Sequence, residues 1–302
     1  MMDLSIIIVN WNTSELLVQC IESIYRGKPR PTFEIIVVDN GSSDDSVSLL
    51  TKHFPNIHLI KNGSNLGFAK ANNQGLAVAK GRYFLLLNSD TIVLPNALDK
   101  MVQTAEDHAD VGAIGPKLLN MDGTLQESWS GFPTFWSELF GRLIHRRNPL
   151  TDVPFAYEVD WIMGACLLVR SETIAEVGGL DEGYSFYSEE VDWCFRMKEQ
   201  GWKILYLSNA EVYHIGGGSS ERNSLIRMGL LYKNKLRYFN KYYGSTQATF
   251  LRYGLALAYF FGLIPRILLI KRSYGGGYWN QILLRVKLIW CLLRNQFPEI
   301  LT

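Results

Sequence analysis

The first ninety residues alternate between short apolar runs and longer stretches in which apolar residues recur with a helical period. The apolar runs, each predicted to be a buried strand, are Leu4–Val9, Phe33–Val38, Ile57–Ile60 and Tyr83–Leu87. The predicted helices between them are Ser14–Tyr25, Asp44–His53 and Phe68–Ala79. Continuous apolar strands that alternate with helices predict a mostly parallel sheet covered on both faces, in a Rossmann-like α/β fold.

The pattern weakens after Met101 and becomes regular again at residue 160. We expect a strand at Val111–Gly115 and an irregular, aromatic stretch from Trp129 to Trp136 that faces a substrate. The predicted elements that follow are an ordered segment Asp160–Val169, helices Ser171–Val177 and Val191–Gln200, and strands Trp202–Leu207 and Glu211–Tyr213. The α/β pattern therefore continues to about residue 213.

Polar residues follow three of the first four strands directly. They are Asn10–Thr13, Asp39–Ser43 and Asn88–Asp90. Parallel strands bind ligands beyond their carboxyl ends, so we expect these loops to open onto one crevice. A dinucleotide-binding fingerprint would need glycines in the turn after the first strand, and that turn has none, which disfavours a dinucleotide-binding domain.

Asp39 ends the second predicted strand. A buried carboxylate at this position can accept a hydrogen bond from the imide N–H of a uracil or thymine ring. The alternative is an aspartate that forms a turn or caps a helix before Gly41.

The segment Asn88-Ser89-Asp90 places an amide oxygen and a carboxylate two residues apart at a strand end. Such a pair can share Mg²⁺ or Mn²⁺ with a diphosphate, and Asp90 is the preferred metal ligand. The alternative is that Ser89 and Asp90 cap a turn.

Three carboxylates, Glu189, Glu190 and Asp192, cluster at the start of a predicted helix. Acidic residues are favoured there by the helix dipole, which is the simpler explanation. Crowded carboxylates also raise one another's pKa, as suits a general base that takes a proton from an alcohol. Glu190 is the candidate base, and Asp192 is a candidate for orienting the acceptor.

His214 ends a predicted strand and precedes the glycine-rich segment Gly216–Ser220. Backbone N–H groups of such a segment can approach phosphate oxygens closely. A structural histidine followed by a flexible glycine run is the alternative.

Composition and charge divide the chain in two. Its 302 residues are 47% hydrophobic and 20% charged, as expected for one large folded domain with an appendage. The net charge is only +1, yet residues 222–302 contain thirteen Lys or Arg and a single acid, Glu299. We therefore expect a catalytic domain at 1–221 and a basic tail at 222–302 with an anionic partner, either a membrane or a nucleic acid.

The apolar residues of the tail decide between those partners. The run Tyr253–Ile264 is interrupted by Pro265-Arg266, and Ile282–Leu293 contains Arg285 and Lys287. Amphipathic helices lying in the membrane interface fit this mixture better than an arm that contacts nucleic acid. A homodimer interface and a spanning helix remain as alternatives, although the runs are shorter than the roughly 20 residues a span requires.

The N-terminus and the cysteines indicate the compartment. The chain begins directly with an apolar strand and shows no secretory signal, so we expect a cytoplasmic protein, peripheral on the inner face of the cell membrane. The four cysteines, Cys20, Cys166, Cys194 and Cys291, lie far apart and form no Cys-x-x-Cys pair. Free, buried thiols are therefore expected rather than disulfides or a zinc site.

Nine segments in order resemble family 2 of the inverting glycosyltransferases. They are Ser5–Asn10, Val37–Asp44, Asn65–Phe68, Leu86–Asp90, Gly164–Val169, Gly178–Asp181, Ser188–Asp192, Gly201–Lys203 and Tyr213–His214. The resemblance covers residues 4–220 and is nearest to bacterial rhamnosyltransferases of cell-surface polysaccharide assembly, followed by galactofuranosyltransferases. It implies a nucleotide-diphospho-sugar transferase fold of the glycosyltransferase A type.

The resemblance also implies roles for single residues. Asp39 would bind the nucleobase, Asp90 would hold the metal with His214 completing its coordination, and Glu190 would be the base. The further positions assigned to donor binding are Asn10, Asn40, Asn65, Gly67, Asn88, Ser89 and Gly216. The chain departs from the family pattern at Asn88, where the metal motif usually has an acid, and at Glu189-Glu190, where Glu-Asp is commoner.

The predicted activity is that of a metal-dependent hexosyltransferase. L-Rhamnose would pass from dTDP-rhamnose to a hydroxyl of a lipid-linked or polysaccharide acceptor, with Mg²⁺ or Mn²⁺, in one inverting displacement. Another UDP- or dTDP-linked sugar such as galactofuranose is an alternative donor. A catalytically silent, nucleotide-binding scaffold in a membrane assembly complex is the alternative from another functional class. No nucleic acid partner is expected.

Overall fold

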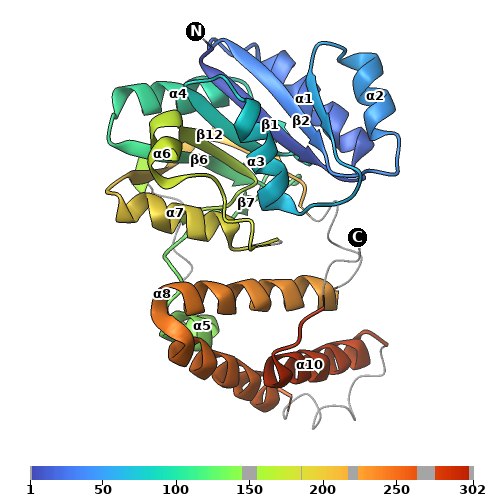
Figure 1. Ribbon diagram of the computed structural model, residues 1–302, viewed down its shortest axis with the longest axis vertical. Helices are drawn as coiled ribbons and strands as arrows, with labels where there is room; N and C mark the ends of the chain where they lie inside the picture. Colours follow the sequence, from blue (N-terminus) through green and yellow to red (C-terminus); the bar gives the residue numbers. More distant parts are fainter. Residues whose placement is uncertain (1, 145–154, 185, 217–223, 264–275, 299–302) are drawn as a thin grey trace. The chain divides into compact units, whose positions relative to one another are not determined.

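The computed structural model describes residues 2–144, 155–184, 186–216, 224–263 and 276–298 (Figure 1). The chain divides into two compact units. The first comprises residues 1–132, 150–185 and 189–219, and the second comprises 133–149, 186–188 and 220–302. The expected boundary between residues 221 and 222 lies outside the described residues. The described residues 133–144, which the sequence analysis included in the catalytic part, group with the C-terminal tail.

A large, mixed sheet forms the centre of the first unit. Its strands run in the order β3-β2-β1-β4-β11-β6-β12-β5. The strands that follow the predicted α/β pattern are β1 (Leu4–Asn10), β2 (Phe33–Asp39), β3 (His58–Lys61) and β4 (Tyr83–Asn88), all mutually parallel. The others are β5 (Thr91–Val93), β6 (Val111–Leu119), β11 (Cys166–Arg170) and β12 (Lys203–His214). The fold is therefore the mostly parallel, Rossmann-like α/β fold that the sequence predicts.

Antiparallel and short strands extend this sheet. Strand β11 runs antiparallel to both β4 and β6, and β5 pairs antiparallel with β12. Short strands β7 (Leu125–Gln126) and β9 (Ala156–Glu158) pair with β6 and β12 respectively. A separate small sheet consists of β8 (Trp129–Ser130) and β10 (Trp161–Ile162).

Helices cover both faces of the sheet because its strands are apolar on both sides. Alternate residues of β1 enter opposite cores, Ile6 and Ile8 on one face and Ile7 on the other. The first core contains residues of α1 (Ser14–Gly27), α2 (Ser46–His53) and α4 (Ala97–Asp107). The second is covered by α3 (Phe68–Val78), α6 (Ser171–Val177) and α7 (Glu189–Glu199).

The short strands β5, β7, β8 and β9 of the first unit were not predicted from the sequence, and two longer elements, β12 and α4, also differ from the prediction. Strand β12 is continuous where two strands were predicted, and its pairing with β6 shifts register between Leu207 and Glu211. That irregularity breaks the period-2 pattern, which is why the sequence indicated two strands. Helix α4 was not predicted, although its buried residues Leu98, Met101 and Val102 have helical spacing.

All four cysteines are free and buried, as predicted. Burial raises the pKa of both Cys20 and Cys194 to about 12. A thiol with so high a pKa is neutral at physiological pH and a poor nucleophile.

The second unit is helical and consists of α5 (Phe135–Ile144), α8 (Ser224–Phe261) and α10 (Gly276–Arg294). Helix α8 kinks at Gly244, whose φ of 86° only glycine adopts readily. Within the unit Lys235 pairs with Glu138, and the hydroxyls of Tyr232 and Tyr259 lie 2.5 Å apart. No helix in the described part of the chain is both long and apolar enough to span a bilayer.

Candidate active site

The carboxyl ends of β1, β2 and β4 lie side by side. Register pairs Asn10 with Asp39 on one side of β1 and Val9 with Asn88 on the other. The amide Nδ2 of Asn10 donates to Oδ1 of Asp39 at 3.1 Å, and both side chains are buried. The polar loops that follow these strands are therefore brought together at one edge of the sheet.

Asp39 is held by neutral donors. Besides Asn10, the backbone N–H of Ser42 donates to its Oδ2 at 3.1 Å. The tight turn between Asp39 and Ser42 requires glycine at position 41. The φ of Gly41 is +78°, and a Cβ there would lie 2.7 Å from the backbone of Ser64. Each carboxylate oxygen has a second lone pair, so Asp39 can accept a further hydrogen bond from a ligand.

Asn40, Asn65 and Gly67 form one network beside Asp39. Asn40 Nδ2 donates to Asn65 Oδ1 at 2.8 Å, and its Oδ1 accepts from the N–H of Leu66 at 3.0 Å. The N–H of Gly67 also donates to Asn65 Oδ1, at 2.9 Å. These contacts hold the loop before α3 against the end of β2, and a direct contact with a donor stays a prediction for all three residues.

A hydroxyl bridge joins the ends of β1 and β4. Thr13 Oγ1 donates to Asn10 Oδ1 at 2.7 Å and lies 2.8 Å from Ser89 Oγ. The bridge fixes the turn between β4 and β5, which carries Asp90. Ser89 thus has a structural contact, and its role toward a donor remains a prediction.

Asp90 and His214 meet although 124 residues separate them in the sequence. Strand β5 pairs with β12 so that Thr91 lies opposite His214, and the N–H of Ile215 donates to the Asp90 carbonyl at 3.0 Å. Asp90 Oδ1 lies 3.4 Å from His214 Nε2, and Asn88 Nδ2 lies 3.4 Å from the same nitrogen. The three side chains predicted to lie at the metal therefore converge on one point.

Sequence reasoning missed Gln126, which contacts the other nitrogen of this histidine. Its Oε1 lies 2.7 Å from His214 Nδ1, and its Nε2 donates to Asn120 Oδ1 at 3.0 Å. An amide oxygen accepts, so Nδ1 carries the proton and Nε2 presents its lone pair toward Asp90. Gln126 belongs to no recognisable motif, and only its position in space connects it with His214.

These donors fit a hard divalent cation. A carboxylate oxygen and an imidazole lone pair face each other at 3.4 Å, and a cation between them would satisfy both. Within the described residues no group of three or more His, Cys, Asp or Glu side chains is arranged to hold a metal. An ion at Asp90 and His214 would therefore take its remaining ligands from water and phosphate oxygens, as Mg²⁺ commonly does.

The acid pair at the start of α7 is brought near the end of β4. The N–H of Asn88 donates to the Ala165 carbonyl at 2.9 Å, and a Cβ on the adjoining Gly164 would lie 3.7 Å from Glu190 Cβ. Burial raises the pKa of Glu189 well above its usual range, and the neighbouring charge of Glu190 raises it further. Burial beside Glu190 therefore favours the neutral form of Glu189 over its charged form.

Asp192, predicted to orient the acceptor, is fully buried. Arg196 Nε donates to its Oδ2 at 2.9 Å, and the Tyr184 hydroxyl donates to its Oδ1 at 3.3 Å. Arg196 also donates to the carbonyl of Gly179 at 2.7 Å, which ties α7 to the turn after α6. Both carboxylate oxygens are thus engaged structurally, and a contact with an acceptor stays a prediction.

Gly216 follows His214 with φ +69°, a left-handed conformation suited to glycine. The rest of the predicted phosphate-binding segment, residues 217–220, lies outside the described residues.

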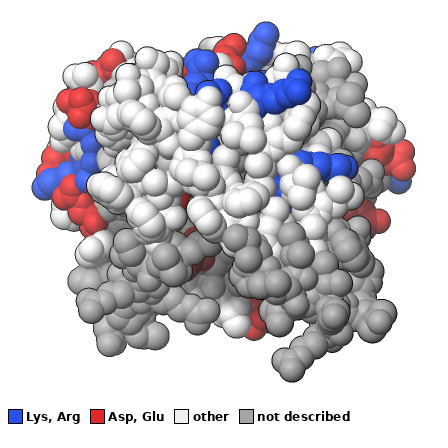
Figure 2. Space-filling model, turned by 90° about the horizontal axis from the view of Figure 1, so that it is seen from below, with Lys and Arg blue, Asp and Glu red and all other residues white. Residues whose placement is uncertain are grey.

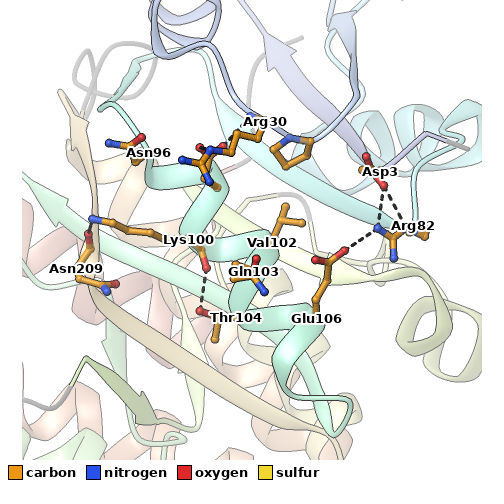
Figure 3. Close-up of a pocket in the computed structure, with 12 residues that line it drawn as sticks. Asp3, Arg30, Arg82, Asn96, Lys100, Val102, Gln103, Thr104, Glu106 and Asn209 are labelled. Atoms are coloured by element: carbon orange, nitrogen blue, oxygen red, sulfur yellow. Dashed lines mark hydrogen bonds and ion pairs between the residues drawn. The ribbon is translucent and has the colours of Figure 1, made fainter.

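A cavity of about 580 Å³ lies at the opposite edge of the same sheet (Figure 3). Arg82 points to two acids there, with its Nη2 2.8 Å from Asp3 Oδ1 and 2.7 Å from Glu106 Oε1. Lys100 donates to the carbonyl of Asn209. Ion pairs within the chain already satisfy the charged groups at the centre of this cavity, so it is not the candidate site.

Comparison with known proteins matches the part of the chain that carries Asn10, Asp39 and Asp90 to a family. The family model described as glycosyl transferase family 2 matches residues 5–165, more than half of the chain. The N-acetylglucosaminyl-diphospho-decaprenol L-rhamnosyltransferase of Mycobacterium tuberculosis is 27% identical over 254 residues, covering 76% of this chain and 82% of the relative. The O-antigen biosynthesis protein RfbC of Myxococcus xanthus is 27% identical over 232 residues, covering 73% of this chain and 18% of that protein.

Two solved structures share the fold. The structure of GalNAc-T7 with UDP, GalNAc and Mn²⁺ has a TM-score of 0.62 and 18% identity, over 95% of this chain and 55% of that one. The mannosyltransferase PcManGT from Pyrobaculum calidifontis, with GDP-Man and Mn²⁺, has a TM-score of 0.58 and 13% identity, over 97% and 86%. With the family match across the strand ends described above, the chain belongs to glycosyl transferase family 2.

Proposed function

We propose that this glycosyltransferase moves L-rhamnose from dTDP-L-rhamnose to an acceptor hydroxyl, with inversion at the anomeric carbon. The donor assignment is supported by the Mycobacterium tuberculosis relative, whose name specifies L-rhamnosyl transfer. Another UDP- or dTDP-linked sugar such as galactofuranose is the second candidate, because a carboxylate that accepts from an imide N–H suits uracil and thymine alike.

Asp39 binds the nucleobase in this proposal. Its oxygens face only neutral donors, Asn10 and the N–H of Ser42, and each oxygen keeps a lone pair for the imide N–H of the base. The network of Asn40, Asn65 and Gly67 keeps the adjoining loop in place. The nucleoside then lies over the ends of β1 and β2, with its diphosphate directed toward β4.

Asp90 and His214 would hold a Mg²⁺ or Mn²⁺ ion, with Asn88 beside them. An ion bound there supplies positive charge that neutralises the leaving diphosphate. Gln126 fixes the His214 tautomer that leaves Nε2 unprotonated, and Gly216 brings backbone N–H groups close to phosphate oxygens. The Mn²⁺ named for GalNAc-T7 and PcManGT supports a divalent metal.

Glu190 is the general base. It accepts the proton of the attacking hydroxyl as the new bond from the acceptor oxygen to the anomeric carbon forms and the bond to the diphosphate oxygen breaks. A single displacement on the face opposite the leaving group inverts the configuration. Burial favours the neutral form of Glu189, which supports Glu190 as the member of the pair that takes the proton.

A lipid-linked or polysaccharide hydroxyl is the proposed acceptor. The relative in Mycobacterium tuberculosis is named for a decaprenol-linked acceptor, and RfbC is named for O-antigen biosynthesis. A lipid-linked acceptor would be met at a membrane, so we place the protein on the inner face of the cell membrane.

The single observation that carries this proposal is the convergence of Asp90, His214 and Asn88 within 3.4 Å at the end of β4, beside the Asn10–Asp39 pair. The test is a calorimetric titration of the purified protein with dTDP-rhamnose, UDP-galactofuranose, UDP-glucose and GDP-mannose, each with and without Mn²⁺. Release of nucleoside diphosphate is followed in parallel.

Metal-dependent binding of a dTDP- or UDP-linked sugar, with slow release of the nucleoside diphosphate, is the expected result. Binding of none of the four donors would overturn the proposal. Tight nucleotide binding without release, with acceptor or without, would point instead to a silent nucleotide-binding scaffold.

A further inference from the structure

The part of α8 after its kink carries apolar side chains on two opposite faces. One face packs inside the second unit through Ala248, Leu251, Leu255 and Tyr259. The opposite face is exposed and carries Phe250, Tyr253, Leu257, Phe260 and Phe261. Phe250, Leu257 and Phe261 are 63%, 56% and 60% exposed. When a helix carries apolar side chains on two faces, one face normally packs within the protein and the other against a second apolar partner.

Helix α10 repeats this arrangement and packs near α8, with Arg285 5.4 Å from the ring of Tyr259. Its buried side chains are Ile282, Leu288, Cys291 and Leu292. Its exposed apolar side chains, spaced three or four residues apart, are Leu283, Val286, Trp290 and Leu293. These two stripes hold nine of the sixteen large apolar side chains that are exposed in the described residues. Such concentration distinguishes a binding surface from singly scattered apolar residues.

The charged side chains of the segment that contains both stripes are all positive. Residues 222–298 contain thirteen Lys or Arg and no Asp or Glu. Arg252 lies 4.8 Å from the ring of Tyr253, and Arg294 lies 5.3 Å from the ring of Trp290. In the upper half of Figure 2 uncharged side chains predominate, with Lys and Arg set among them and acidic residues along the margin, at the sides and at the top.

This chemistry selects a bilayer over a second copy of the chain. Exposed Trp and Tyr beside Arg, next to aliphatic side chains, are the composition of the membrane–water interface. A self-associating face would bring the cations of two copies together without a carboxylate from residues 222–298 to pair with them. An anionic leaflet offers both the apolar layer and the negative charge.

We infer that the exposed stripes of α8 and α10 form a docking surface that lies in the interface of a bilayer containing anionic phospholipid. Phe250, Leu257 and Phe261 of α8 enter the boundary of the acyl chains together with Trp290 of α10. Arg252, Lys287 and Arg294 contact the phosphate groups. Since no described helix can span, the docking is peripheral. The inference needs no donor or acceptor and holds whatever sugar is transferred.

The test is cosedimentation of the full chain with vesicles of phosphatidylcholine alone or mixed with phosphatidylglycerol, without any nucleotide. Each basic residue near an anionic surface strengthens binding about fivefold. The triple variant Arg252→Gln, Lys287→Gln, Arg294→Gln should therefore bind mixed vesicles roughly a hundredfold more weakly. The matched control is Lys52→Gln, Lys61→Gln, Lys70→Gln, three exposed cations of the first unit, and it should bind as the wild type does.

The apolar stripe is tested with Leu257→Ser and Trp290→Ala, against Met121→Ser as an equally exposed control in the first unit. Binding to mixed vesicles should fall in the first two variants only. Equal binding of the charge variant and its control would overturn the inference. Failure of the wild type to bind mixed vesicles would also overturn the inference. A dimer in sedimentation velocity that Leu257→Ser dissociates would then show that the stripes bind a second copy of the chain. The charge variant keeps the test decisive if an apolar substitution impairs folding.

Discussion

The two edges of the central sheet contain similar residue types in opposite electrostatic arrangements. At the amino edge, where the parallel strands begin, Arg82 forms ion pairs with both Asp3 and Glu106 (Figure 3). The Arg82 guanidinium lowers the pKa of Asp3 to about 2. At the carboxyl edge no Lys or Arg in the described residues forms an ion pair with Asp39, Asp90 or Glu189. Their partners are amides, backbone N–H groups, an imidazole and another acid.

The difference separates structural charge from charge kept for a ligand. The charges of Arg82, Asp3 and Glu106 are already neutralised by one another, so the cavity at the amino edge offers a charged ligand no unpaired partner among these three residues. No cation of the described part of the chain occupies Asp39 or Asp90, so a ligand can supply a cation or an imide N–H to these two carboxylates. Cavity size alone would therefore select the wrong edge.

Replacing Asp90 should have the largest effect. Asp90→Ala removes the carboxylate facing His214 and, with it, the charge stabilisation that a bound ion gives the leaving diphosphate. That stabilisation is several kcal/mol, and about 1.4 kcal/mol changes a rate tenfold, so kcat/KM should fall on the order of 10⁴-fold. Steady-state assays of Asp90→Ala and of Asp3→Ala at the amino edge measure the contrast. Comparable losses in both would contradict the assigned difference between the edges.

The acid pair should show an asymmetric effect within the carboxyl edge itself. Glu190→Gln keeps the shape but removes the base, and kcat should fall ~10²–10⁴-fold with donor affinity nearly unchanged. Glu189→Gln replaces an acid whose neutral form burial favours, so it should lose far less activity. Rates of both variants with saturating donor and acceptor decide the matter. The reverse order would transfer the role of base to Glu189.

Gln126 should act through metal affinity. Gln126→Leu releases the Nδ1 of His214 and allows the wrong tautomer, so Mn²⁺ affinity in the presence of nucleoside diphosphate should fall about 10–100-fold. Calorimetric titration with Mn²⁺ measures this without turnover. Gln103→Leu at the amino edge is the control, and a Gln126→Leu protein with unchanged Mn²⁺ affinity would exclude the positioning role.

The smallest effect is expected at the amino edge and concerns stability. Arg82→Met removes the partner of Asp3 and Glu106 and should cost about 0.2–1 kcal/mol at neutral pH, since Arg82 is 43% exposed and solvent screens its pairs. The pKa of Asp3 is depressed in the folded state. Its stabilisation is therefore present above about pH 4 and is lost as the pH falls toward 2.

Urea unfolding of wild type and Arg82→Met across that pH range should show the difference shrinking with acid, while transfer activity at neutral pH stays the same. A large loss of activity in Arg82→Met would mean that the amino edge takes part in function.

The sequence predicted those parts of the molecule whose signal is local. Strands β1, β2 and β4 are mostly buried on both faces and so appear as apolar runs. Asn10, Asp39 and Asp90 follow from their position at strand ends. Contacts set by tertiary structure left no such signal. Gln126 meets His214 across 88 positions of sequence, and residues 133–144 join the helical unit through contacts such as Glu138 with Lys235. The register shift in β12 interrupts its alternating pattern, so the sequence predicted two strands where the structure has one.

The central claim is that the carboxyl edge holds a metal together with the nucleoside diphosphate of the donor. Paramagnetic broadening of the histidine ring signals by Mn²⁺ tests it most directly, with dTDP or UDP present or absent, because His214 lies at that edge and His108 follows α4 near the other. The account predicts that Mn²⁺ with the nucleoside diphosphate broadens the His214 signals and leaves those of His108 sharp. Broadening of His108 with His214 unaffected, or of neither, would contradict it.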